Sequence, residues 1–167
     1  MISCTEFIPA YSELYKYLED LGGADAVMDY WRYVSDEYVA CRLGNLVKEK
    51  GIMGCWEYWD KALNEEAADF AMEVDEEAGL FTIDMRYCPS KGRLLKLEHM
   101  EPYYDYCGHC DVLYRRVLEP EGFVCYADMS RTDKAACFFR MTRTENPLLV
   151  APRREMPKPG NPAPGEL

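Results

Sequence analysis

The chain has 167 residues, enough for one domain with a sizeable hydrophobic core. Its net charge of −11 argues against the basic surface that nucleic-acid binding requires, and no apolar run is long enough to span a membrane. The N-terminus, Met1 to Glu6, lacks the basic and apolar regions of a signal peptide. Eight cysteines without such a signal indicate a reducing compartment, so we expect a cytoplasmic protein with reactive, metal-bound or buried thiols.

The charge is unevenly distributed along the chain. Residues 1–79 carry 18 acidic and 6 basic side chains, whereas residues 80–143 carry 9 acidic and 10 basic ones. The second half is therefore close to neutral. An overall acidic protein of this kind can still accept a small carboxylate substrate in its C-terminal half.

Three helices are predicted in the first 66 residues: Ser12–Leu21, Ala24–Lys50 and Met53–Glu66. Gly22 and Gly23 end the first helix. The longest helix has apolar residues at alternating spacings of four and three, which predicts one buried stripe. The residues of this stripe are Val27, Trp31, Val34, Tyr38 and Cys41.

Beyond residue 69 the period changes from 3.6 to 2, which predicts strands. Residues 70–75 and 81–88 form a hairpin around Gly79, and residues 90–99 form a short helix or turn. Residues 123–129 and 135–141 form a second pair of strands. We therefore predict a single α+β domain over residues 1–146, in which helices pack on one face of a four-stranded antiparallel sheet. Residues 147–167 are rich in proline and are predicted to form an extended tail.

A Cys-x-x-Cys motif stands between the two hairpins, at the start of a further predicted helix that ends near Leu118. On a helix, Cys107, Cys110, Asp111 and Tyr114 fall at i, i+3, i+4 and i+7 and so share one face. A cysteine in the first helical turn meets the positive end of the helix dipole, which favours a thiolate. By the same spacing His109 lies off this face, so Asp111 is the better proton partner.

Cys88 at the end of one strand and Cys137 in the last strand complete a quartet with Cys107 and Cys110, and we expect Cys88, Cys110 and Cys137 to meet near one end of the sheet. Three kinds of chemistry are open to these thiols: nucleophilic catalysis, a zinc site with sulfur ligands, or a dithiol redox pair. Buried, inert cysteine is the fourth interpretation. We assign it to the remaining cysteines, which are Cys4, Cys41, Cys55 and Cys125.

The C-terminal half resembles the L-2-amino-thiazoline-4-carboxylic acid hydrolase family. The resemblance covers residues 80–143 and rests on four segments. They are the strand Phe81–Cys88 followed by Pro89, the helix from Tyr106 to Tyr114, Ser130-Arg131-Thr132, and Cys137-Phe138-Phe139-Arg140-Met141.

This resemblance implies a hydrolase that opens a C–N bond of a small cyclic amidine or thiazoline carboxylate with a cysteine nucleophile and no cofactor. The implied catalytic residues are Cys110, Cys107, Asp111, Cys88 and Cys137, and either Cys107 or Cys110 is the nucleophile. The implied substrate-binding residues are Arg131, Arg140, His109 and Tyr114. The alternative is a non-enzymatic module that binds zinc or a small molecule through Cys88, Cys107, Cys110 and Cys137. Neither interpretation requires nucleic acid or a membrane, and both are compatible with a homodimer.

Overall fold

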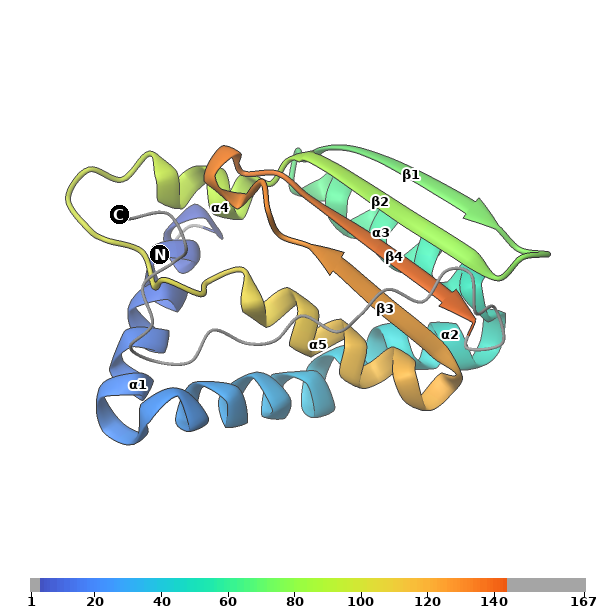
Figure 1. Ribbon diagram of the computed structural model, residues 1–167, viewed down its shortest axis with the longest axis horizontal. Coiled ribbons are helices and arrows are strands. Elements are labelled where there is room, and N and C mark those ends of the chain that lie inside the picture. Colours follow the sequence, from blue (N-terminus) through green and yellow to red (C-terminus); the bar gives the residue numbers. More distant parts are fainter. Residues whose placement is uncertain (1–3, 144–167) are drawn as a thin grey trace, which may run out of the picture.

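The computed structural model describes residues 4–143, with side chains from Glu6 onward. It confirms the α+β class, because helices cover one face of a four-stranded antiparallel sheet (Figure 1). The strands are β1 (Asp69–Asp75), β2 (Leu80–Tyr87), β3 (Phe123–Asp128) and β4 (Cys137–Arg143). Their order is β1-β2-β4-β3, so both predicted hairpins form and β4 joins them by pairing with β2. The tail predicted for residues 147–167 lies outside the described residues.

The face of the sheet that meets the helices is apolar, as the alternation of the strands predicts. Phe81 and Ile83 of β2 and Met141 of β4 are almost completely buried on this face. Helix α3 (Ile52–Glu65) packs on β1 and β2, and Trp59 of α3 stacks on Phe81 with ring centroids 5.6 Å apart. Helix α5 (Gly108–Leu118) packs on β3.

The first helix, α1 (Cys4–Val34), is two helical segments joined at a kink. Gly22 and Gly23 have non-helical backbone angles there, and Gly23 has a φ of 72° that glycine adopts without steric cost. The prediction that these glycines end the first helical segment is therefore confirmed. The second segment continues into η1 (Ser35–Gly44), α2 (Asn45–Lys50) and, after Gly51, α3.

The element η1 is a π-helix, and it overturns part of the predicted stripe. A π-helix holds more residues per turn than an α-helix, because its hydrogen bonds run from i to i+5. The buried positions therefore continue at intervals of four: Val27, Trp31, Ser35, Val39, Leu43 and Val47. Tyr38 and Cys41, predicted to be buried, are exposed instead, so the assignment of Cys41 to the core is wrong.

Three features fix η1 against α5. Ser35 is fully buried, and its hydroxyl donates to the carbonyl oxygen of Leu113 at 2.8 Å. Gly44 lies where an added Cβ would be 3.2 Å from a methyl group of Val117, so the glycine that interrupts the predicted helix marks a close approach to α5. On the surface, Asp36 of η1 accepts two hydrogen bonds from Arg116 of α5.

The molecule has two hydrophobic clusters. The larger one lies between the sheet and the helices α3, η1 and α5. The smaller one is aromatic, and it joins α1, α4 (Pro89–Leu95) and the loop that leads into α5. Its buried residues are Tyr15, Val27, Trp31, Leu94, Tyr103 and Tyr106. Within residues 4–143, no helix is both long and apolar enough to cross a membrane.

Candidate functional site

The four cysteines of the quartet lie where the two hydrophobic clusters meet. Cys88 follows β2 directly, and its backbone N–H donates to the carbonyl oxygen of Ala135, just before β4, at 2.6 Å. Cys137 begins β4 opposite Met85. Cys88, Cys110 and Cys137 pack against the larger cluster, whereas Cys107 packs against the aromatic one.

These thiols are close enough for their charges to interact. The pKa of Cys137 is raised first by burial and then by Cys110, Cys88 and Cys107. Cys88 and Cys107 also each interact with Cys110. The prediction that Cys88, Cys110 and Cys137 meet near one end of the sheet is thereby confirmed, with Cys107 beside them.

Burial controls the ionisation of these thiols, and it acts against the predicted thiolate. Burial raises the pKa of Cys107 and that of Cys110 to about 12, and it also raises the pKa of Cys88. Cys107 directly precedes α5 and Cys110 lies in its first turn, as predicted. The loss of hydration nevertheless outweighs the helix dipole, because desolvation shifts a pKa by several units and an exposed helix end by a fraction of one.

The thiol of Cys110 is in hydrogen-bond contact with the imidazole of His109. The imidazole Nδ1 of His109 donates to the carbonyl oxygen of Tyr106. This bond leaves Nε2 with a free lone pair, which lies 3.4 Å from the Cys110 sulfur and can accept its proton. By helical spacing alone, His109 is predicted to lie off the face that carries the cysteines. Its imidazole lies near Cys110 instead, because the hydrogen bond to Tyr106 turns the ring back over the first turn of the helix.

Asp105 adds a buried carboxylate to the same turn. Its exposure is 5 %, and the carboxyl group lies next to Gly108, where an added Cβ would be 2.4 Å from Asp105 Oδ2. Burial lowers the pKa of His109, and the charge of Asp105 acts in the opposite direction. Asp105 therefore favours the imidazolium that forms when His109 takes a proton.

Asp111, the predicted proton partner, forms an ion pair on α5. Its carboxylate accepts a hydrogen bond from Arg115 at 2.7 Å, and Arg115 also reaches Glu119 at 3.4 Å. The i, i+4 spacing on α5 favours this ion pair. Asp111 still acts on Cys110 through its charge, which raises the pKa of that thiol after burial has done so.

The two predicted arginines differ in their relation to the thiols. Arg131 donates to Asp84 at 2.8 Å, and Asp84 lies on the face of β2 opposite to Met85 and Cys137. Arg140 alternates with the buried residues of β4, and its guanidinium lies 5.2 Å from the ring centroid of Tyr126. Arg131 nevertheless lies beside one member of the quartet, because it also donates to the carbonyl oxygen of Cys137 at 3.4 Å and its charge opposes the rise in the pKa of that thiol. No such contact links Arg140 to a cysteine among the described contacts.

Tyr114 lies beside the thiols, as the shared helix face predicts. Its ring contacts Trp59 at 4.9 Å and Tyr58 at 6.3 Å between centroids. Burial raises its pKa well above the ordinary value, and Cys110 and Cys88 add to that shift. The phenol is thus a neutral hydroxyl in an apolar setting.

The sequence pattern did not predict that Asp105, Tyr58 and the imidazole of His109 lie near Cys110 and its neighbours. Tyr58 has a signal in the sequence, because it flanks the aromatic stripe formed by Trp56 and Trp59. Asp105 has none, because its role depends on the turn that folds residues 103–108 over the start of α5.

The described residues offer no set of ligands for the zinc site that is the alternative prediction. Across the described chain, histidine, cysteine, aspartate and glutamate side chains do not gather in threes at the spacing that a metal ion requires. The thiols are neighbours without forming a coordination cage.

Comparison of the whole chain with known protein families, curated proteins and solved structures finds no match.

The raised pKa values predict slow alkylation of the clustered thiols. At pH 8 a thiol with a pKa of about 12 is ionised to roughly one part in 10⁴, so Cys107 and Cys110 are expected to react with iodoacetamide far more slowly than the exposed Cys41. Peptide mass spectrometry over pH 6–10 measures each rate in one sample. Rapid modification of Cys110 near neutral pH would show that its thiolate is stabilised after all.

Proposed function

We propose that the protein is a cysteine-dependent hydrolase that opens a C–N bond of a small cyclic amidine or thiazoline carboxylate, with Cys110 as the nucleophile. The observation that carries this proposal is the contact between Cys110 Sγ and His109 Nε2, with Nδ1 held by Tyr106. A nucleophile, a base and a group that orients the base are the elements of nucleophilic catalysis. The resemblance over residues 80–143 supplies the substrate class.

The geometry favours a proton transfer during attack over a preformed thiolate. The pKa of Cys110 is raised and that of His109 is lowered, so both groups are neutral at pH 7. His109 takes the thiol proton as the sulfur adds to the amidine carbon, and Asp105 stabilises the imidazolium. The imidazolium then protonates the ring nitrogen as the C–N bond breaks. Water next attacks the carbon bound to sulfur, and the thiol of Cys110 is released.

The other members of the cluster shape the surroundings of this reaction. Cys88, Cys107, Cys137 and Tyr114 border Cys110 with weakly polar groups whose pKa values are raised by burial. Such a setting strengthens charge interactions and limits the access of water. In this proposal Cys107 is a neighbour of the nucleophile, because the sulfur in contact with the imidazole is that of Cys110.

The pH dependence of activity tests the proposal. We expect the wild-type protein to open the ring of 2-amino-2-thiazoline-4-carboxylate, followed by loss of the substrate in a chromatographic assay. His109 must be neutral to accept the proton, and burial lowers its pKa below 6.5, so kcat/KM should fall only in acid, with a midpoint below 6.5, and stay level from pH 7 to 9.

Two results would contradict these expectations. A rate that rises with a midpoint near 8.5 indicates an ionising thiolate and removes His109 from the base role. Absence of ring opening at every pH rejects the proposed reaction.

A further inference from the structure

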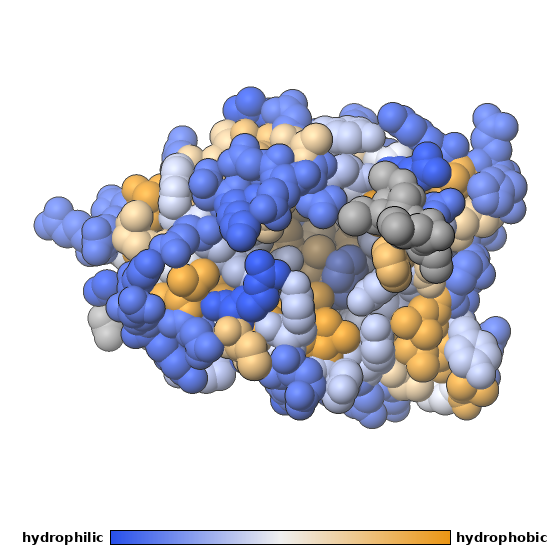
Figure 2. All heavy atoms as spheres, turned by 180° about the vertical axis from the view of Figure 1, so that it is seen from behind, coloured by the Kyte–Doolittle hydropathy of each residue, from blue (hydrophilic) through white to orange (hydrophobic). Residues whose placement is uncertain are grey.

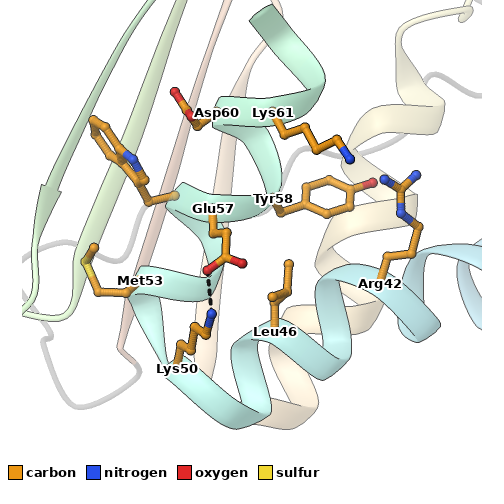
Figure 3. Close-up of a pocket in the computed structure, with 9 residues that line it drawn as sticks. Arg42, Leu46, Lys50, Met53, Glu57, Tyr58, Asp60 and Lys61 are labelled. Carbon is orange, nitrogen blue, oxygen red and sulfur yellow. Dashed lines mark hydrogen bonds and ion pairs between the residues drawn. The ribbon is translucent and has the colours of Figure 1, made fainter. Parts of the chain in front are cut away.

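A pocket of about 470 Å³ lies on the helical side of the molecule, between η1 and α2 on one wall and α3 on the other (Figure 3). Arg42, Lys61 and Tyr58 line one end of it, and Lys50 and Glu57 line the other (Figure 3). Leu46, Met53 and Trp56 supply an apolar wall. Seen from behind, the surface of the molecule is largely hydrophilic, with separate hydrophobic side chains between the polar ones (Figure 2).

The positive charges in this pocket are not all neutralised. Lys50 is paired with Glu57 at 2.6 Å, and Asp60 accepts a hydrogen bond from Asn64 and points away from Arg42 (Figure 3). Arg42 and Lys61 have no acidic partner among the described residues.

This lack of partners stands out in the acidic N-terminal half. The other basic side chains of residues 6–79 are all ion-paired: Lys16 with Glu13, Arg32 with Asp29, Lys48 with Glu121 and Lys50 with Glu57. Arg42 and Lys61 line the same pocket, and Figure 3 shows both side chains at the end of it where Tyr58 lies. Two cations that line one pocket without a paired acid favour an anion there.

Arg42 is also held in position. Its guanidinium donates to the hydroxyl of Tyr38 at 2.5 Å and lies 5.4 Å from the Tyr38 ring and 5.8 Å from the Tyr58 ring. A guanidinium fixed in this way keeps further N–H donors for a carboxylate, which it can bind with two parallel hydrogen bonds.

We propose that this pocket binds the carboxylate end of a small organic anion between Arg42 and Lys61, with the body of the molecule on the apolar wall. Tyr58 connects the pocket to the thiols. Burial raises the pKa of Tyr58, the charge of Arg42 opposes that shift and Cys110 adds to it, and the Tyr58 side chain is hydrogen-bonded to that of Tyr114. That the anion is the substrate of Cys110 rests on the proposed function, whereas the binding site itself does not.

Binding to a protein that cannot turn over provides the test. In a Cys110→Ser background, 2-amino-2-thiazoline-4-carboxylate and benzoate are titrated by NMR or calorimetry, with uncharged 2-amino-2-thiazoline for comparison. Loss of one charge-assisted interaction predicts that Arg42→Gln and Lys61→Gln each weaken binding of the carboxylates by about tenfold or more. Binding of the uncharged compound should not change. Lys48→Gln removes a cation outside the pocket and is the matched control.

The outcomes separate this inference from the proposed function. If neither carboxylate shows binding that depends on Arg42, the inference is overturned, whether or not the wild type is a hydrolase. If the wild type opens the thiazoline ring and Arg42→Gln leaves KM unchanged, the anion of this pocket is not the substrate and the proposed function stands. If carboxylates bind in an Arg42-dependent way and no ring opening occurs, the binding site stands and the proposed reaction fails.

Discussion

Replacing Gly54 by alanine is expected to lower the free energy of unfolding by about 3 kcal/mol, at the upper end of the usual range for overpacking. Gly54 is buried in α3 where this helix crosses α2. An added Cβ would lie 2.4 Å from the carbonyl oxygen of Leu46 and 2.7 Å from the backbone nitrogen of Val47. Because both atoms belong to the backbone of α2, relief requires the two helices to move apart.

Gly44→Ala is the matched control for this prediction. Gly44 is also a buried glycine in a helix, but its nearest neighbour is a methyl group of Val117 at 3.2 Å, which can shift by a few tenths of an ångström. Helix propensity alone would make each substitution stabilising by about 0.5–1 kcal/mol. Urea unfolding followed by circular dichroism measures both variants. Equal stability of Gly54→Ala and Gly44→Ala would show that α2 and α3 do not approach as closely as described.

The buried stripe shows which part of the fold can be predicted from residue patterns. An α-helical period correctly places Val27 and Trp31 in the interior. It fails from Ser35 onward, because η1 is a π-helix and its turn holds more residues. Nothing in the side chains of residues 35–44 signals that change, which comes from the packing of η1 on α5. Strands are more predictable, since a period of two does not depend on such adjustments.

The candidate site also has one part that residue patterns predict and another that they do not. The positions of Cys88 and Cys137 at the ends of paired strands follow from the alternation and from Pro89, so their approach to the Cys-x-x-Cys helix could be predicted. The partner of Cys110 could not, because it depends on where one imidazole hydrogen-bonds. The pKa values of the thiols could not be predicted from the sequence either. A position at a helix start predicts a lowered pKa, and only the fold reveals the burial that raises it.

Substitution of Cys110 and His109 is expected to have the largest effect on activity. Cys110→Ser should lower kcat/KM for the thiazoline carboxylate by about 10³-fold or more, because a hydroxyl is a far weaker nucleophile than a thiol beside a neutral imidazole. His109→Gln should cost about 10²–10⁴-fold, the usual contribution of a general base, and should abolish the acid limb of the pH profile.

The remaining variants decide between the open alternatives. Cys107→Ser should retain most of the activity, because the Cys107 sulfur has no described contact with the imidazole, and Cys41→Ser should be indistinguishable from the wild type because Cys41 is exposed. Asp111→Asn should change activity only a few-fold, since its carboxylate is engaged by Arg115.

Steady-state kinetics and thermal unfolding of each variant separate loss of chemistry from loss of structure. If Cys107→Ser is inactive and folded while Cys110→Ser retains activity, the nucleophile is Cys107 and the imidazole contact is structural. If Asp111→Asn loses activity as severely as His109→Gln, the aspartate moves the proton and must leave Arg115 during the reaction.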